Sequence, residues 1–84
     1  MPAATADGTH VIQIGAFQKA ADAIALKQTM LDKEYPAYVM EADLGDKGLW
    51  YRVRLGPYAD ADKAEVVRRR IEAKDQLKGY VTRR

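Results

Sequence analysis

The chain has 84 residues, 48% of them hydrophobic, and its 14 basic and 12 acidic residues leave a net charge of +2. This length corresponds to one domain with a modest core, and so small a positive charge is weak evidence for a polyanionic partner. The absence of cysteine excludes a disulfide framework, a thiolate zinc site and a cysteine nucleophile.

Residues 1–8 are small, polar and proline-containing, a composition typical of a flexible linker tail. They lack the apolar segment of a signal peptide, and no apolar run in the chain approaches the ~18 residues of a membrane span. We therefore expect one folded domain over residues 9–84, which is part of a longer protein.

The first half of the chain predicts a strand, a helix and a second strand. Polar and apolar residues alternate from Thr9 to Gly15, which indicates a strand ended by a glycine turn. Apolar residues at helical spacing predict a helix from Ala20 to Lys33, and Pro36 prevents its continuation. A strand is expected from Pro36 to Ala42.

The second half repeats this order. After turn residues 43–48, alternation predicts a strand from Leu49 to Leu55, which Gly56-Pro57 is expected to break. Asp60 or Asp62 can cap a helix that runs to about Ala73, and Asp62 with Glu65 has capping-box spacing. A short final strand is expected at residues 79–83.

The two halves resemble each other in sequence. Residues 11–17 (VIQIGAF) return as residues 52–58 (RVRLGPY), a shift of 41 residues that also relates the apolar positions of the two helices. The order β-α-β-β-α-β with right-handed crossovers predicts a ferredoxin-like or RNP-like α+β fold, in which both helices cover one face of a four-stranded antiparallel sheet. The first and third strands should lie side by side at its centre, related by a pseudo-twofold axis.

Strand alternation predicts which side chains line the sheet face that no helix covers, here called the open face. Thr9, Val11 and Gln13 come from the first strand, and Trp50, Arg52 and Arg54 come from the third. A tryptophan exposed on a sheet suggests ligand contact, and the arginines and glutamine add planar hydrogen-bonding groups. Such a face suits a sugar, a nucleobase or an extended peptide.

With its paired glycine-aromatic turns, the chain resembles a SPOR domain (sporulation-related repeat) over roughly residues 9–81. The resemblance implies a non-catalytic bacterial module that binds peptidoglycan, with a preference for denuded glycan strands, which carry no stem peptides and are enriched at division septa. The module would then target its parent protein to the septum. It also implies that the glycan-binding residues include Gln13, Ala16, Trp50, Arg52 and Val81, and the face assignment adds Arg54. Ala16 departs from the small polar residue often found there, and Glu34 stands where a glycine often ends the first helix.

The resemblance further implies a periplasmic or cell-envelope location. The parent protein would be a division protein, a cell-wall amidase or a lytic transglycosylase, and only its own anchor would contact the membrane. Other division or cell-wall proteins are possible partners, and a monomer is expected. No cofactor, metal or nucleic acid is expected, since the only histidine is His10 and the acidic residues lie in turns and caps without metal-ligand spacing.

Two other kinds of module use the same open face. RNA-recognition modules share this strand order, but they need two or three sheet aromatics in a pattern that residues 49–56 do not match. A protein-protein interaction module remains the second alternative. An enzyme is disfavoured, since the sequence shows no nucleophile-base pair, metal cluster or phosphate loop, and Arg68, Arg69 and Arg70 are expected to form a solvated helix face.

Overall fold

A computed structural model describes residues 1–84 and contains two helices and one four-stranded sheet. The observed order β-α-β-β-α-β agrees with the prediction, and the ends of each element differ from the predicted ones by a few residues. The elements are β1 (His10–Phe17), α1 (Ala20–Asp32), β2 (Ala37–Asp43), a 3-10 turn η1 (Gly45–Lys47), β3 (Leu49–Tyr58), α2 (Ala61–Asp75) and β4 (Tyr80–Arg83).

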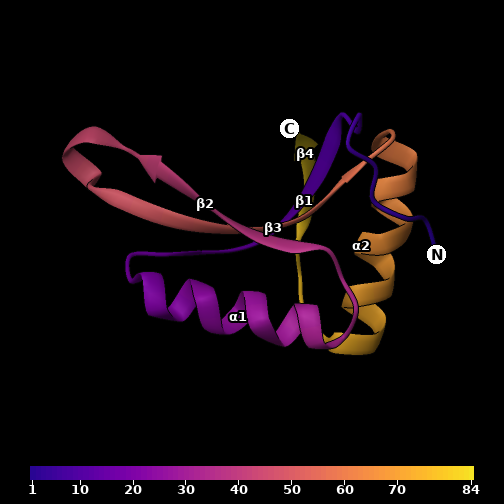
Figure 1. Ribbon diagram of the computed structural model, residues 1–84, viewed down its shortest axis with the longest axis horizontal. Coiled ribbons are helices and arrows are strands. Elements are labelled where there is room, and N and C mark those ends of the chain that lie inside the picture. The colour runs from indigo at the N-terminus through magenta and orange to yellow at the C-terminus, as the bar shows by residue number, and fades with distance from the viewer.

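The sheet has the strand order β2-β3-β1-β4, and all neighbouring strands are antiparallel. The two strands that carry the repeated sequence, β1 and β3, therefore form the centre of the sheet, as the sequence predicts. The β2–β3 hairpin extends beyond the rest of the sheet, at the left in Figure 1. The predicted α+β fold is confirmed.

Both helices pack against the same face of the sheet. Ala23 and Met30 of α1, and Val67 and Ile71 of α2, join Leu55 and other strand residues in one core cluster of 12 buried residues. In Figure 1, α1 lies below the β2–β3 hairpin and α2 lies beside the other end of the sheet. Neither helix is long and apolar enough to cross a bilayer.

The repeated glycines do not end the strands, which corrects a prediction from the sequence. Pairing with the neighbouring strand shifts register at Gly15, so that Ile14 is the extra residue of a β-bulge, and then continues to Phe17. In β3 the register shifts between Leu55 and Tyr58, and Gly56 takes a φ of 125° that favours glycine. Each strand therefore has a bulge next to its glycine and continues beyond it.

The central pairing supports the predicted pseudo-twofold axis. Gln13 lies opposite Arg54, and these residues occupy equivalent positions 41 residues apart in the two copies. When two strands are related by a twofold axis, a residue lies directly opposite its equivalent in the other copy only at the point where the axis crosses the strand pair. The axis therefore runs through the Gln13–Arg54 pair.

The helix ends show one prediction confirmed and one corrected. Asp60 caps α2, since its Oδ1 accepts a hydrogen bond from the Lys63 amide at 2.8 Å. The capping box proposed for Asp62 with Glu65 does not form, because Asp60 is the N-cap and Asp62 lies inside the first turn of α2. After α1, Glu34 takes a left-handed φ of 68°, the conformation that a glycine adopts without strain.

Two sets of contacts hold the periphery together. Asp75 at the end of α2 accepts hydrogen bonds from Lys33 Nζ at 2.8 Å and from Tyr35 Oη at 3.1 Å, and both bonds lower the pKa of its carboxyl group. The segment predicted as a linker tail makes contacts in residues 5–8, where the Thr5 amide donates to the Pro57 carbonyl at 2.9 Å. Gly8 is buried against the end of β3.

Candidate functional site on the open face

The register places five of the six predicted site residues on the open face. Gln13 lies opposite Arg54, and Ala16 lies opposite Arg52 across the central strand pair. Trp50 is two residues further along β3, on the same face as both arginines. The five side chains therefore form a strip along the middle of the sheet, with Arg54 at one end and Trp50 at the other.

Val81 is the predicted residue that the structure does not bring to this strip. It pairs with Ile12 and packs against the core on the helix-covered face. Its neighbours Tyr80 and Thr82 lie opposite Gln13 and Val11, so they are the residues of β4 that share the open face. The last strand is too short for its alternation to reveal its orientation from sequence alone.

Gln13 and Arg54 form the buried end of the strip. The Arg54 Nε donates a hydrogen bond to Gln13 Oε1 at 3.1 Å, and each residue is only 9% exposed. Arg54 Nη1 also lies 3.4 Å from the sulfur of Met40, which is a weak acceptor. These contacts orient the guanidinium group but leave it without a carboxylate partner.

Trp50 lies at the base of the β2–β3 hairpin loop and is half-buried. Its indole Nε1 donates to the Lys47 carbonyl at 3.0 Å, so the polar edge of the ring is bound to the loop. Within the loop, Asp43 Oδ1 accepts from the Gly45 amide at 3.0 Å. The loop therefore fixes the indole ring and leaves a partly exposed apolar surface beside the open face.

Arg52 and Ala16 lie between these two ends. The side chain of Arg52 is half-buried and forms no hydrogen bond or ion pair with the rest of the chain. The methyl group of Ala16 is exposed and offers no hydrogen-bonding group of its own. The guanidinium group of Arg52 thus has no partner within the chain.

A hollow of about 430 Å³ lies at the Arg54 end of the strip. Tyr38 and Met40 face it from β2, since they pair with Arg54 and Arg52 respectively. The sequence reasoning did not include these two residues, although the alternation of β2 contains the signal for them. It also missed Arg84, which only the tertiary structure brings to this hollow. The hollow is lined by Tyr38, Val39, Met40, Arg54, Pro57 and Arg84.

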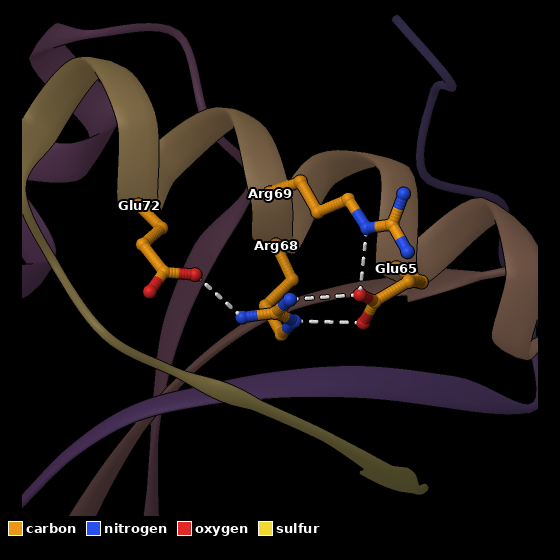
Figure 2. A network of polar contacts seen from close by, with 4 residues as sticks. All are labelled: Glu65, Arg68, Arg69 and Glu72. Carbon is orange, nitrogen blue, oxygen red and sulfur yellow. Dashed lines mark hydrogen bonds and ion pairs between the residues drawn. The ribbon is translucent and has the colours of Figure 1, made fainter.

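The arginine-rich part of α2 is neutralised by its own carboxylates. Arg68 donates to both carboxylate oxygens of Glu65, at 2.7 and 2.8 Å, and to Glu72 at 2.8 Å. Arg69 also donates to Glu65, at 3.0 Å, as Figure 2 shows. These bonds, chiefly from Arg68, lower the pKa of Glu65 to about 2 and raise that of Arg68. Arg68 and Arg69 are therefore engaged within the helix surface.

The histidine and the acidic residues form no metal-binding cluster. His10 Nδ1 lies 2.8 Å from the Thr9 hydroxyl. No group of three or more histidine, cysteine, aspartate or glutamate side chains comes close enough to hold a metal ion. The open face is thus the part of the surface where several planar and polar groups are gathered.

The fold and this face define a small α+β domain in which one side of the sheet is available to a ligand. The SPOR domain family matches residues 6–83, and the chain belongs to that family. The family match begins within the segment whose residues 5–8 contact the folded domain.

Two solved structures have the same fold. The peptidoglycan-binding domain of the Bacillus subtilis cell wall lytic enzyme CwlC is 24% identical, with a TM-score of 0.75 over 100% of this chain and 99% of that one. A putative exported protein from Burkholderia pseudomallei is also 24% identical, with a TM-score of 0.72, and the match spans 98% of this chain but 17% of that one. No curated protein sequence gives a significant match.

Proposed function

We propose that this SPOR domain is a non-catalytic module that binds the glycan strands of peptidoglycan on its open face. The observation that carries the proposal is the strip itself, where a partly exposed indole, an unpaired arginine and a glutamine–arginine pair share one face. Membership of the SPOR family and the likeness to a peptidoglycan-binding domain support it.

The side chains of the strip suit a sugar ligand. The indole of Trp50 can pack against the apolar face of a pyranose ring, and its N–H group is already bound to the loop. Arg52 can donate to hydroxyl, carbonyl or carboxylate oxygens. The amide nitrogen of Gln13 remains a donor, because Arg54 uses its oxygen. Gln13, Ala16, Trp50, Arg52 and Arg54 are therefore the proposed contact residues.

We further propose that the preferred ligand is denuded glycan and that this preference targets the parent protein to the division septum. A stem peptide on each muramic acid would hinder the close approach of a strand to a sheet. Removing the peptide also restores the charge of the lactyl carboxylate, which an arginine can bind. The parent would then act in the cell envelope, in division or in cell-wall cleavage.

The test compares binding of the purified domain to cell-wall sacculi before and after amidase treatment. We expect more domain to sediment with treated sacculi, and we expect Trp50→Ala to reduce that binding about tenfold, because the stacking surface is lost. Ile24→Ala is the matched control, since Ile24 is 55% exposed on α1, away from the open face.

Each other outcome contradicts part of the proposal. Equal binding to both preparations would refute the preference for denuded glycan, and absence of binding would refute the function. Retention on RNA with a steep salt dependence would favour the RNA-binding alternative instead. Circular dichroism of the Trp50→Ala variant separates a lost contact from a lost fold.

A further inference from the structure

The hollow at the Arg54 end of the open face gathers positive charge without a counter-ion. Its lining residues include Arg54 and Arg84, and none of them is an aspartate or a glutamate. The remaining lining residues are Tyr38, Val39, Met40 and Pro57, which are apolar or aromatic. The composition suits a ligand that combines an anionic group with an apolar body.

Of the two arginines, Arg54 gives the stronger evidence for an anionic ligand, because a buried guanidinium group normally has an anionic partner. Arg54 is 9% exposed, and its contacts are one neutral amide oxygen and one thioether sulfur. By contrast, Arg68 on α2 is more exposed and has two carboxylate partners. The missing partner of Arg54 is therefore expected from outside the chain.

Arg84 is held in place by contacts that leave part of its guanidinium group free. Its backbone amide donates to the Thr9 carbonyl at 2.9 Å, which extends the pairing of β4 with β1. Its Nη1 donates to the carbonyls of Ala6 and Gly8, at 2.8 and 3.4 Å. Its Nε and Nη2 make no hydrogen bond in the chain, so they remain available to an anion at little further loss of side-chain entropy.

We propose that this hollow binds the lactyl carboxylate of a denuded muramic acid residue, with Arg54 and Arg84 as its charge partners. The inference rests on the proposed glycan-binding function and adds a specific subsite to it. A volume of about 430 Å³ is in the range of small-ligand sites. Tyr38, Met40 and Pro57 would contact the sugar ring and the lactyl methyl group, while Arg52 would contact a neighbouring part of the strand.

The experiment compares two forms of denuded glycan fragments, one with free carboxylates and one converted chemically to methylamides. Amidation removes the charge but adds little bulk, so it separates charge from the steric effect of a stem peptide. We expect the wild-type domain to bind the free carboxylate form about tenfold more tightly, as a charge-assisted hydrogen bond predicts.

Three variants test which residues cause the preference for the free carboxylate form. Arg84→Gln should remove most of the preference for the carboxylate form, and Arg54→Lys should reduce it while keeping the charge. Arg52→Ala is the comparison variant, and it should weaken binding of both forms by a similar factor. Arg84 is exposed and lies after the last strand, so we expect its substitution to preserve the fold even if Arg54 variants fail to fold, and circular dichroism of each variant checks this.

The possible results distinguish failure of the carboxylate subsite from failure of the proposed glycan-binding function. Equal binding of both forms by the wild-type domain would overturn the carboxylate subsite and leave glycan binding intact. An unchanged preference in Arg84→Gln, or a loss of preference only in Arg52→Ala, would also overturn it. Failure to bind either form would refute the proposed function itself.

Discussion

Tyr58 carries a buried hydroxyl group with no hydrogen-bond partner. Burial raises the pKa of this hydroxyl to about 12, from an ordinary value of 10.0. The equivalent residue in the first copy of the repeat is Phe17, 41 residues earlier, so this position of the repeat accommodates an aromatic ring without a hydroxyl group. The hydroxyl of Tyr58 therefore opposes folding.

We expect Tyr58→Phe to raise the free energy of unfolding by about 1 kcal/mol, because an unsatisfied polar group leaves the core. Tyr35→Phe is the matched comparison and should lower it by about 1–2 kcal/mol, since the Tyr35 hydroxyl donates to Asp75. Urea denaturation of the three proteins at pH 7 measures both changes. A loss of stability in Tyr58→Phe would show that its hydroxyl has a partner.

The same residue predicts the behaviour of the domain at alkaline pH. Between the unfolded pKa near 10 and the folded value of about 12, the unfolded chain loses the Tyr58 proton while the folded domain keeps it. Stability is therefore full below pH 10 and falls as the pH rises, by about 2–3 kcal/mol in total from this group. The decline should be shallower in Tyr58→Phe.

Sequence reasoning placed single residues well where a strand was long. The alternation of residues 49–55 was sufficient to assign Trp50, Arg52 and Arg54 to one face, because side chains along a strand point alternately to its two faces. The family resemblance placed Val81 in the site, whereas its pairing with Ile12 in the four-residue β4 puts it on the helix-covered face. Sequence reasoning could not find Arg84, since only the folded chain brings that residue to Arg54.

At the level of the elements, glycines and helix ends were the difficult points. A glycine in a strand is equally compatible with a break and with a bulge, and only the neighbouring strand decides which occurs. Both β1 and β3 continue past their glycines because the pairing resumes after each bulge, at Gly15 in β1 and at Tyr58 in β3. The predicted helix cap at Asp60 formed because its hydrogen bond is local in sequence.

The end of α1 gives an element-scale prediction. The Glu34 amide donates to the Leu31 carbonyl and the Tyr35 amide donates to the Met30 carbonyl, which is the Schellman arrangement that favours glycine at the left-handed position. Glu34→Gly should raise the free energy of unfolding by about 1 kcal/mol, because the strain of a Cβ atom at φ 68° is removed.

Glu34→Ala is the control for this prediction, since alanine keeps the Cβ atom while removing the carboxylate. Its stability should stay within about 0.5 kcal/mol of the wild type in the same urea titration. A similar gain in both variants would attribute the effect to the charge of Glu34 rather than to its backbone conformation.

At the level of the whole molecule, ligand binding and folding are coupled. The strands that form the open face also form the floor of the single core, so a ligand on that face stabilises the entire domain. Denuded glycan fragments at about 100 times their dissociation constant should raise the free energy of unfolding by about 2.7 kcal/mol. Chemical denaturation with and without fragments tests this, and Trp50→Ala should show a much smaller rise.

The position of Gln13 opposite Arg54 has a consequence for the direction of a bound strand. If two identical halves met at the pseudo-twofold axis, this position would face its own copy, and a polymer could lie on the sheet in two equivalent orientations. Here the two copies carry unlike residues, and the arginine lies at the end of the strip that holds the second guanidinium group. Because this position and the equivalent pairs Thr9/Trp50 and Val11/Arg52 all differ between the two copies, the open face has a direction, and the two ends of a bound glycan chain would meet different chemistry.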